Sequence, residues 1–209
     1  MKRLTLPKLY PLTDARLSGL AHAEQVRRLA AGGARLIQLR EKHATPREFC
    51  AAAAEAVAVA RELGVRIIVN DRADIVLAAG ASGVHLGQDD LDPSAARRLL
   101  GDDLIIGYST HTLEQARAAA RLPVDYVAFG PIFPTRTKEN PDPTVGLEEL
   151  RRVREVIGPA TPLVAIGGIT RETARAVLDA GADSVAVVGA LVAGGEEIER
   201  RTREFLAVL

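Results

Sequence analysis

Short runs of β-branched and other apolar residues alternate with longer Ala-, Leu- and Arg-rich stretches along the chain. The short runs have the length of buried strands, and the longer stretches repeat apolar residues at helical spacing, which is typical of parallel strands joined by crossover helices. We predict strands over residues 8–13, 35–40, 66–71, 83–87, 104–109, 126–131, 163–168 and 184–190. We predict helices over residues 21–33, 46–64, 73–81, 93–101, 113–122, 147–158, 171–182 and 196–209.

The number of strand–helix units decides between two α/β architectures. Eight such units in 209 residues match the lower size limit of a TIM barrel, about 200 residues, whereas an open doubly wound sheet usually has fewer strands. No composition shift marks a linker or a second domain. We therefore predict an α/β fold, a single (β/α)8 TIM barrel, with residues 1–209 forming one domain.

The overall composition limits the classes of partner. The chain carries 27 Lys plus Arg and 27 Asp plus Glu, so no net charge attracts nucleic acid or a membrane surface. No apolar run approaches the roughly 20 residues of a membrane helix. Cys50, the single cysteine, lies in an Ala-rich run and is expected to have a structural role. We expect a cytoplasmic protein with small-molecule substrates and without nucleic-acid or membrane partners.

Charged residues collect where the predicted strands end, which is where barrel enzymes build their active sites. The cations of this group are Arg40, Lys42, Arg72, Arg136 and Lys138. Because the chain has no net charge, such a cluster on one rim predicts a site for an anion with several charges, such as a diphosphate.

Two carboxylates, Asp71 and Asp90, follow adjacent predicted strands. Together with a diphosphate they would supply hard oxygen ligands for Mg²⁺, with waters completing the octahedron. The alternative is that these carboxylates only form surface ion pairs with Arg72 and its neighbours.

Glycines follow the last two predicted strands, in the segments around Gly168 and Gly189. Glycine lets backbone N–H groups approach a phosphate, and this fold often binds phosphate there. Glycine at a strand–helix turn can equally be a steric solution.

Two histidines occupy positions where acid–base chemistry is conceivable. His85 lies inside a predicted strand, and we interpret it as a hydrogen-bonded core residue; His111, just after a strand, is better placed for proton transfer or for orienting Ser109. No zinc-type His or Cys spacing and no phosphate-binding P-loop motif occurs.

Taken together, these segments resemble the thiamine phosphate synthase family, also called thiamine-phosphate pyrophosphorylases. The resemblance covers nearly the whole chain and lies in QLREK (38–42), NDR (70–72), GVHLGQDD (83–90), STHT (109–112), GPIFPTRTK (130–138) and VAIGGI (164–169).

The resemblance implies a reaction of 4-amino-2-methyl-5-(diphosphooxymethyl)pyrimidine with a thiazole phosphate, forming thiamine phosphate and releasing pyrophosphate. It implies pyrimidine diphosphate contacts from Gln38, Leu39, Arg40, Glu41, Lys42, Asn70, Ser109 and Lys138. It implies thiazole phosphate contacts from Thr135, Arg136, Thr137, Gly168, Val188 and Gly189. Asp71 and Asp90 would ligate Mg²⁺, and the expected catalytic residues are Lys138, Ser109 and Arg40.

One position departs from the family pattern, which usually has Ser where this chain has Gly189. The side-chain hydroxyl is lost, whereas a contact through the backbone N–H would be kept.

Three alternatives remain open at this point. The first is a thiazole tautomerase with His111 as its base, which would need neither the PTRTK segment nor the carboxylate pair. The second is a non-catalytic barrel that binds thiamine precursors, since fold alone does not establish activity. The third is a phosphate-binding barrel of another pathway. Residues 138–146 are a candidate lid, and the oligomeric state is left open, with a homodimer as one option.

Overall fold

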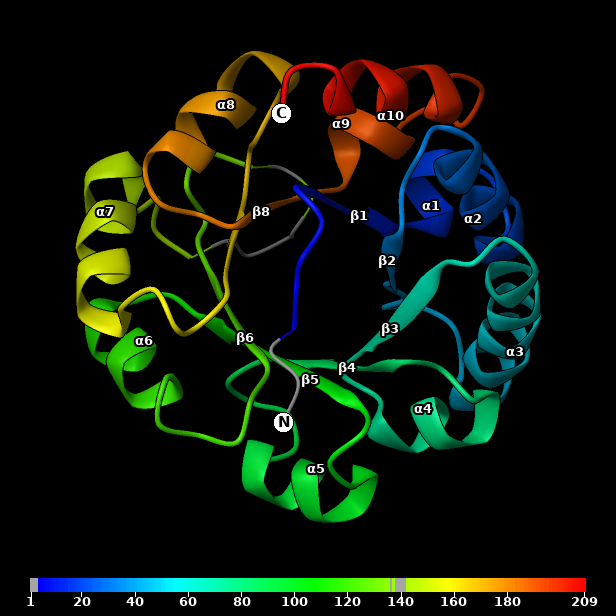
Figure 1. Cartoon of the computed structure of the whole chain (residues 1–209). Coiled ribbons are helices and arrows are strands. Elements are labelled where there is room, and N and C mark those ends of the chain that lie inside the picture. The colour runs from blue at the N-terminus through cyan, green and yellow to red at the C-terminus, as the bar shows by residue number, and fades with distance from the viewer. Residues whose placement is uncertain (1–3, 136, 138–141) are drawn as a thin grey trace.

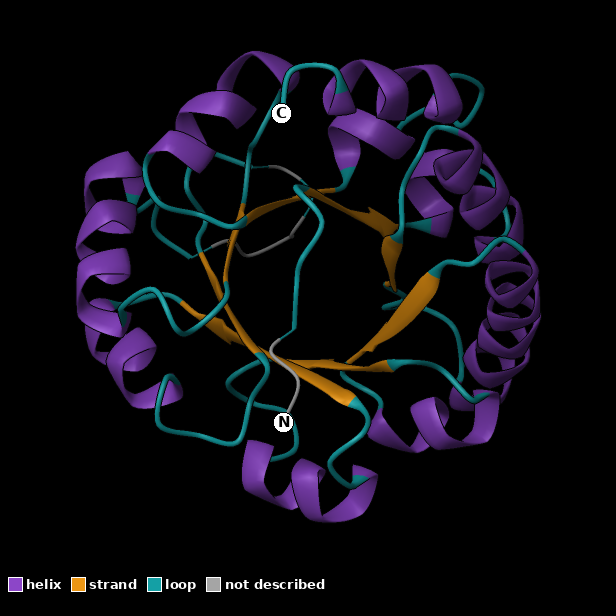
Figure 2. Ribbon diagram, in the orientation of Figure 1, coloured by secondary structure: helices purple, strands orange, loops and turns teal. Residues whose placement is uncertain are grey.

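The computed structural model describes residues 4–135, 137 and 142–209. Eight parallel strands form a closed barrel in chain order, and β1 pairs with both β2 and β8. The helices surround this barrel as an outer ring (Figures 1 and 2). The predicted (β/α)8 TIM barrel is therefore confirmed.

The strands are β1 (Leu9–Thr13), β2 (Leu36–Leu39), β3 (Arg66–Asn70), β4 (Gly83–Leu86), β5 (Ile105–Thr110), β6 (Tyr126–Phe129), β7 (Leu163–Ile166) and β8 (Ser184–Val187). The helices are α1 (Ala15–Ser18), α2 (His22–Ala31), α3 (Pro46–Glu62), α4 (Ala73–Ala79), α5 (Pro93–Leu100), α6 (Leu113–Ala119), α7 (Gly146–Ile157), α8 (Arg171–Asp179), α9 (Gly189–Val192) and α10 (Ile198–Leu206).

The last three strands end earlier than the sequence predicts. β6 stops before Gly130 and Pro131, and proline has no N–H to donate to a neighbouring strand. β7 stops before Gly167 and Gly168, whose φ angles of 102° and 62° leave the extended region. Beyond β8, Gly189 already begins the short helix α9, which the sequence did not predict; nor did it predict α1.

Alternating side chains of the strands divide between two apolar layers. One set points outward and packs under the helices in the main core, where Cys50 also packs, partly buried. The other set points inward and fills the barrel with Tyr10, Leu12, Leu36, Ile68, Tyr126, Ala128, Val164 and Ala186. Because both faces are buried, the strands are apolar nearly throughout, as expected for a parallel sheet.

The segment before β1 covers the amino-terminal end of the barrel. Leu4 and Leu6 pack against the inner apolar cluster, and the Arg66 guanidinium donates to the Thr5 carbonyl at 3.4 Å. In Figure 1 this dark blue segment crosses the barrel opening on its way to β1. The amino-terminal end is thus closed, which leaves the opposite end for a site.

Side chains and glycines determine where several helices begin and end. Thr45 and Glu48 form a capping box at the start of α3, and Asp92 caps α5. Gly80 ends α4 in the left-handed conformation that glycine adopts at low cost. No helix in the described part of the chain is long and apolar enough to cross a bilayer.

Candidate active site

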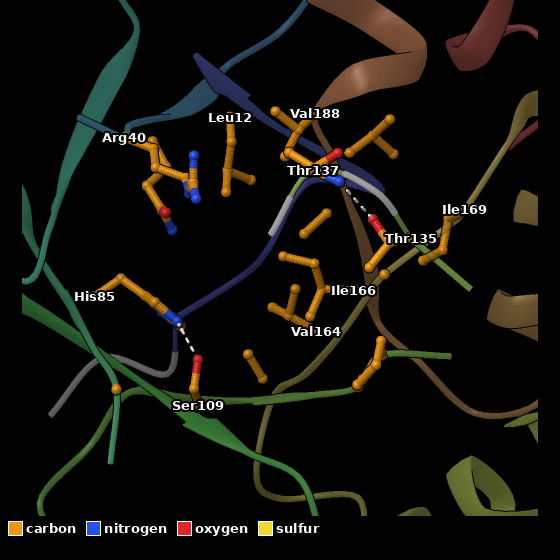
Figure 3. Close-up of a pocket in the computed structure, with 18 of the residues that line it drawn as sticks. Leu12, Arg40, His85, Ser109, Thr135, Thr137, Val164, Ile166, Ile169 and Val188 are labelled. Atoms are coloured by element: carbon orange, nitrogen blue, oxygen red, sulfur yellow. Dashed lines mark hydrogen bonds between the residues drawn. The ribbon is translucent and has the colours of Figure 1, made fainter. Parts of the chain in front are cut away.

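A cavity of about 790 Å³ lies at the carboxyl-terminal ends of the strands. Figure 3 shows Arg40, His85 and Ser109 on one side of it and Thr135, Thr137 and Val188 on the other. The residues implied by the family resemblance that line it are Gln38, Arg40, Lys42, Asn70, Asp90, Ser109, Thr135, Thr137, Gly168, Val188 and Gly189. The fold therefore brings most of the predicted site together.

Other predicted residues lie elsewhere. The Leu39 side chain is fully buried in the main core, and the Glu41 carboxylate accepts from the backbone N–H groups of His43 (2.8 Å) and Ala44 (3.2 Å). A ligand contact from either residue would have to come from the backbone. The Arg72 guanidinium pairs with the Asp74 carboxylate, and Arg72 is not among the residues that line the cavity. Arg136 and Lys138, with part of the predicted lid, lie outside the described residues.

Arg40 is held at the rim by the loop that follows β1. Its guanidinium donates to Asp14 Oδ2 at 2.8 Å, and its backbone N–H donates to Thr13 Oγ1 at 3.4 Å. The Asp14 carboxylate also accepts from Leu17 N, which caps α1. A guanidinium with five donors keeps several of them for an anion in the cavity.

Two carboxylates and one ammonium group converge at the ends of β3 and β4. Lys42 Nζ lies 2.5 Å from Asp71 Oδ2, and the Asp90 carboxylate accepts from Gly87 N at 2.7 Å. Burial and the neighbouring Asp71 charge raise the pKa of Asp90. The repulsion between two neighbouring carboxylates is relieved by a cation beside them or by a proton on one of them.

The backbone at Asp71 supports a functional reason for this arrangement. Among the described residues that are not glycine, Asp71 alone has a left-handed φ, 65°. Such a conformation costs on the order of 1 kcal/mol or more and tends to occur at functional sites. Its N–H donates to the His85 carbonyl at 2.8 Å, which holds the strained residue against β4.

His85 and Ser109 form the polar floor of the cavity, as the dashed line in Figure 3 shows. His85 Nε2 lies 2.8 Å from Ser109 Oγ, and its Nδ1 lies 2.9 Å from the Tyr126 hydroxyl. Burial lowers the pKa of His85 to about 4, so the ring is neutral near pH 7. The structure supports the interpretation of His85 as a buried, hydrogen-bonded residue, and it adds that this residue lines the cavity.

Asn70 is the end of β3 and pairs with His85 in the sheet register. It is 8% exposed. Within the described part of the chain, its Nδ2 is the buried side-chain polar atom that has no hydrogen-bond partner. Such an unpaired donor costs about 1–3 kcal/mol, which a ligand acceptor in the cavity would recover.

His111 lines the cavity beyond β5. Its Nδ1 lies 2.7 Å from the Gly130 carbonyl, which can only accept, so the proton is on Nδ1. This contact fixes the ring orientation and leaves Nε2 as the basic nitrogen of the neutral ring. Asp142 lies 3.6 Å from the same ring.

The glycines after β7 are required by close packing. A Cβ on Gly167 would lie 2.4 Å from Pro131 Cβ, and one on Gly168 would lie 2.4 Å from the Pro134 carbonyl oxygen. The steric explanation of these glycines therefore holds, and it allows the segment carrying Thr135 to reach the cavity. At Gly189 a Cβ would meet only Thr137 Oγ1, at 3.5 Å.

Sequence reasoning missed two tyrosines beneath the cavity. Tyr10 lines it, and Tyr126 lies directly under His85, with the two rings stacked at 5.5 Å. Both were assigned only to strands. The alternation of side chains along a strand could have identified them. Residues two positions apart in a strand point to the same face, so a polar residue two positions from an inward-facing residue also points into the barrel.

The fold and the cavity together define a class: (β/α)8-barrel enzymes whose site lies at the carboxyl-terminal ends of the strands. Residues 9–191 match the family model described as thiamine monophosphate synthase. The chain belongs to this family, whose members are transferases of thiamine biosynthesis.

Individual relatives agree with the family match. A thiamine-phosphate synthase of Koribacter versatilis is 47% identical over 213 residues, covering 99% of this chain and 97% of the relative. One of Chloroflexus aurantiacus is 43% identical and covers 97% of this chain and 92% of the relative. The solved thiamine phosphate pyrophosphorylase of Pyrococcus furiosus superposes with a TM-score of 0.85 at 38% identity, covering 96% of this chain and 94% of that chain.

Proposed function

We propose that this enzyme joins 4-amino-2-methyl-5-(diphosphooxymethyl)pyrimidine to a thiazole phosphate, forming thiamine phosphate and releasing pyrophosphate. The observation that carries the proposal is one cavity with two chemically different sides. Arg40, Lys42 and Asp90 lie at the ends of β2 to β4, with Asp71 held beside them by Lys42, and threonines and glycines lie at the ends of β6 to β8. Two phosphorylated substrates can then lie side by side with their reacting atoms between the two groups.

The diphosphate would lie on the side of Arg40 and Lys42. Both cations line the cavity, and each is already held by a carboxylate, Asp14 or Asp71. The orphaned Asn70 Nδ2 supplies a further donor for a phosphate oxygen or a ring acceptor. Gln38 and Ser109, deeper in the cavity, would contact the pyrimidine.

Mg²⁺ is the cofactor that this donor set fits. Asp71 and Asp90 are hard oxygen donors from adjacent strand ends, and burial, with the neighbouring Asp71 charge, raises the pKa of Asp90. A bound Mg²⁺ would neutralise negative charge on the departing diphosphate. Lys42, now paired with Asp71, would then be free to turn toward a phosphate oxygen.

The thiazole phosphate would lie on the side of Thr135, Thr137 and the backbone at Gly168, Val188 and Gly189. Thr137 N already donates to Thr135 Oγ1 at 3.3 Å, which shapes this segment as a turn beside the cavity. Arg136 and Lys138 belong to the same segment, and we propose them as further cations for the two anionic groups.

In this reaction the bond between the exocyclic carbon and the diphosphate oxygen breaks, and a bond from the thiazole nitrogen to that carbon forms. The electron pair of the broken bond leaves with pyrophosphate. The pyrimidine amino group donates electron density to the cationic carbon. Arg40, Lys42 and Lys138 would stabilise the leaving group electrostatically, and the enclosed floor would keep water from the cation.

The test is incubation of the purified protein with both substrates and Mg²⁺, with thiamine phosphate and pyrophosphate measured separately. Formation of both products in equal amounts, lost with EDTA and restored by added Mg²⁺, is the expected result. Binding of both ligands without either product would refute the proposal.

The tautomerase alternative has one observation in its favour, the basic Nε2 that the Gly130 contact leaves on His111. It predicts isomerisation of a thiazole carboxylate phosphate without any pyrophosphate, and loss of that activity in His111→Asn. The carboxylate pair at Asp71 and Asp90 has no role in such a reaction, which favours the synthase.

A further inference from the structure

Five polar side chains from five strands form a continuous hydrogen-bonded chain under the cavity. The Gln38 amide nitrogen donates to the Tyr10 hydroxyl at 3.1 Å, and the two tyrosine hydroxyls lie 3.0 Å apart. The Tyr126 hydroxyl contacts His85 Nδ1 at 2.9 Å, and His85 Nε2 contacts Ser109 Oγ at 2.8 Å. The chain begins and ends at residues that line the cavity.

The middle of this chain is sealed from solvent. Tyr10 is 1% exposed and Tyr126 is fully buried, with the two rings edge to face at 6.0 Å. Gly107 on β5 makes room for the Tyr126 phenol, because a Cβ there would lie 2.0 Å from its Cζ. Donating each hydroxyl hydrogen to a member of the chain leaves neither phenol unpaired, and unpaired buried donors are costly.

With Gln38 Nε2 as the donor to the Tyr10 hydroxyl, these contacts run in one direction. The Tyr10 oxygen accepts from Gln38 Nε2, so the Tyr10 hydrogen is donated to the Tyr126 oxygen. The Tyr126 hydrogen is then donated to His85 Nδ1. A neutral imidazole that accepts at Nδ1 carries its hydrogen on Nε2, which donates to Ser109 Oγ.

The two ends consequently present opposite hydrogen-bonding character to the cavity. Ser109 Oγ, which accepts from His85, keeps its own hydrogen to donate. Gln38 uses one N–H of its amide on Tyr10, which fixes the orientation of the amide and leaves Oε1 to accept. Burial supports this assignment, since it raises the pKa of both phenols and keeps their hydrogens in place.

We propose that Tyr10, Tyr126 and His85 are positioning residues that hold Gln38 as an acceptor and Ser109 as a donor, and so select a heterocycle offering an amine beside an unprotonated ring nitrogen. The inference rests on the proposed function, because the aminopyrimidine substrate carries an amine beside an unprotonated ring nitrogen. The corresponding oxo analogue, with a carbonyl and a ring N–H, offers the reverse pattern and would be rejected.

A ligand at this depth has independent support from Asn70. Its unpartnered Nδ2 is more than nine-tenths buried and lines the same cavity, beside His85 in the sheet register. By contrast, Val164, Ile166 and Ala186 line the cavity at β7 and β8. Apolar side chains are therefore sufficient to fill the floor there, and packing does not require the polar side chains of the hydrogen-bonded chain.

The first experiment needs no turnover. In ¹⁵N-labelled full-length protein, the ring nitrogens of His85, assigned by their loss in His85→Gln, are expected to report hydrogen on Nε2. Tyr126→Phe removes the donor to Nδ1 and is expected to give a mixture of tautomers. Tyr108→Phe is the matched control, because Tyr108 packs against the main core outside this chain, and it should leave the spectrum unchanged. Hydrogen on Nδ1 in the unmodified protein would overturn the proposal.

The second experiment measures selectivity by calorimetric binding of the aminopyrimidine alcohol and its oxo analogue. The unmodified protein is expected to prefer the amine, and Tyr126→Phe to lose about tenfold of that preference, the value of roughly one hydrogen bond. His85→Gln, whose amide nitrogen can replace Nε2 toward Ser109, should keep more of the preference than His85→Asn, which is too short. An unchanged preference in Tyr126→Phe would refute the inference.

The steady-state constants separate this inference from the proposed function. In Tyr126→Phe the Michaelis constant for the pyrimidine diphosphate should rise about tenfold, with the constant for the thiazole phosphate unchanged. An equal rise in both constants would mean a merely structural role. Complete absence of thiamine phosphate formation by the unmodified protein would refute the proposed function, whereas the tautomer and binding results would still decide the role of the chain.

Discussion

The two ends of the barrel treat charged side chains in opposite ways. At the amino-terminal end, Arg97 on α5 donates to Asp125 Oδ2 at 2.7 Å and to the carbonyls of Gly101, Leu104 and Pro123. Arg154 on α7 repeats this pattern with Asp183 and three carbonyls. Each Asp also accepts from a strand N–H, that of Ile106 or Leu163. In both pairs the charges are compensated within the protein.

At the carboxyl-terminal end the compensation is incomplete. Asp71 and Asp90 repel one another, Asp71 adopts a left-handed φ, and Asn70 Nδ2 is buried without a partner. These features lower the stability of the protein, and the proposed cation and anion would compensate them. The comparison shows that stability and function are separated along the barrel axis, which can be tested by substitutions at either end.

The largest effect is expected from Asp71→Asn. Removing one of two carboxylates at a site for a divalent cation should lower kcat/KM on the order of 10²–10³-fold, comparable to losing a main electrostatic contact in a transition state. The melting temperature should stay the same or rise, because the repulsion with Asp90 is relieved. Pyrophosphate release, titrated with Mg²⁺, is the measurement. Asp102→Asn, an exposed carboxylate near the other end, is the control and should be silent.

Arg97→Ala at the amino-terminal end is expected to lower the unfolding free energy and to leave kcat/KM unchanged. The Arg97 and Asp125 side chains are only 11% and 16% exposed, so losing this pair with its carbonyl contacts should cost about 3 kcal/mol of unfolding free energy. For a domain of this size that is a drop of roughly 6–12 °C in melting temperature. Differential scanning calorimetry measures it. kcat/KM should be unchanged, and Arg98→Ala on the exposed face of α5 should have neither effect.

A smaller effect is expected from pH, through His85 at the boundary between the two regions. Burial lowers the pKa of His85 in the folded protein to about 4, below the usual value of 6.5, so the unfolded chain binds the proton more strongly. The unfolding free energy should therefore fall as pH decreases from 6.5 toward 4, by about 2 kcal/mol between pH 7 and pH 5 from this residue.

Urea titrations of the unmodified protein and of His85→Gln measure this contribution as the difference between their pH slopes. The variant lacks the titrating group and should lose less stability over the same interval. Identical slopes in the two proteins would show that His85 is not neutral in the folded state.

The smallest effect is expected from Gly189→Ser. The added Cβ meets only Thr137 Oγ1 at 3.5 Å, so serine fits, and its hydroxyl should lower the Michaelis constant for the thiazole phosphate by at most about fivefold, the value of one hydrogen bond. Gly168→Ala is the instructive contrast, because its Cβ would collide with the Pro134 carbonyl and should damage folding of the loop. An unaltered constant in Gly189→Ser would show that the backbone alone makes this contact.

Most of the fold followed from residue order. Apolar strands of four to six residues, such as Leu163–Ile166, stand out because both faces are buried, and helices such as Pro46–Glu62 carry their own capping residues. The errors lie at the carboxyl ends of β6 to β8. Pro131 follows β6, Gly167 and Gly168 after β7 have left-handed or otherwise positive φ angles, and Gly189 after β8 begins α9.

The candidate site was predicted as a group of strand ends, and this held for the side chains that continue the inward parity of their strand, such as Gln38 and Ser109. It failed for Arg72 and Leu39, since the first binds its neighbour Asp74 and the second points to the helices. Proximity along the chain does not reveal which of two nearby carboxylates a guanidinium will choose.

The sequence by itself determined the parallel barrel and the end at which the cavity lies, because hydrophobic periodicity and strand order can be recognised in each segment separately. Only the tertiary structure decided the hydrogen-bonded chain beneath the cavity. Tyr10 and Tyr126 are 116 residues apart, and their hydroxyls meet because the barrel closes with both side chains inside and Gly107 leaves them room. The direction of a hydrogen bond depends on every partner in such a network, which no single segment of the chain contains.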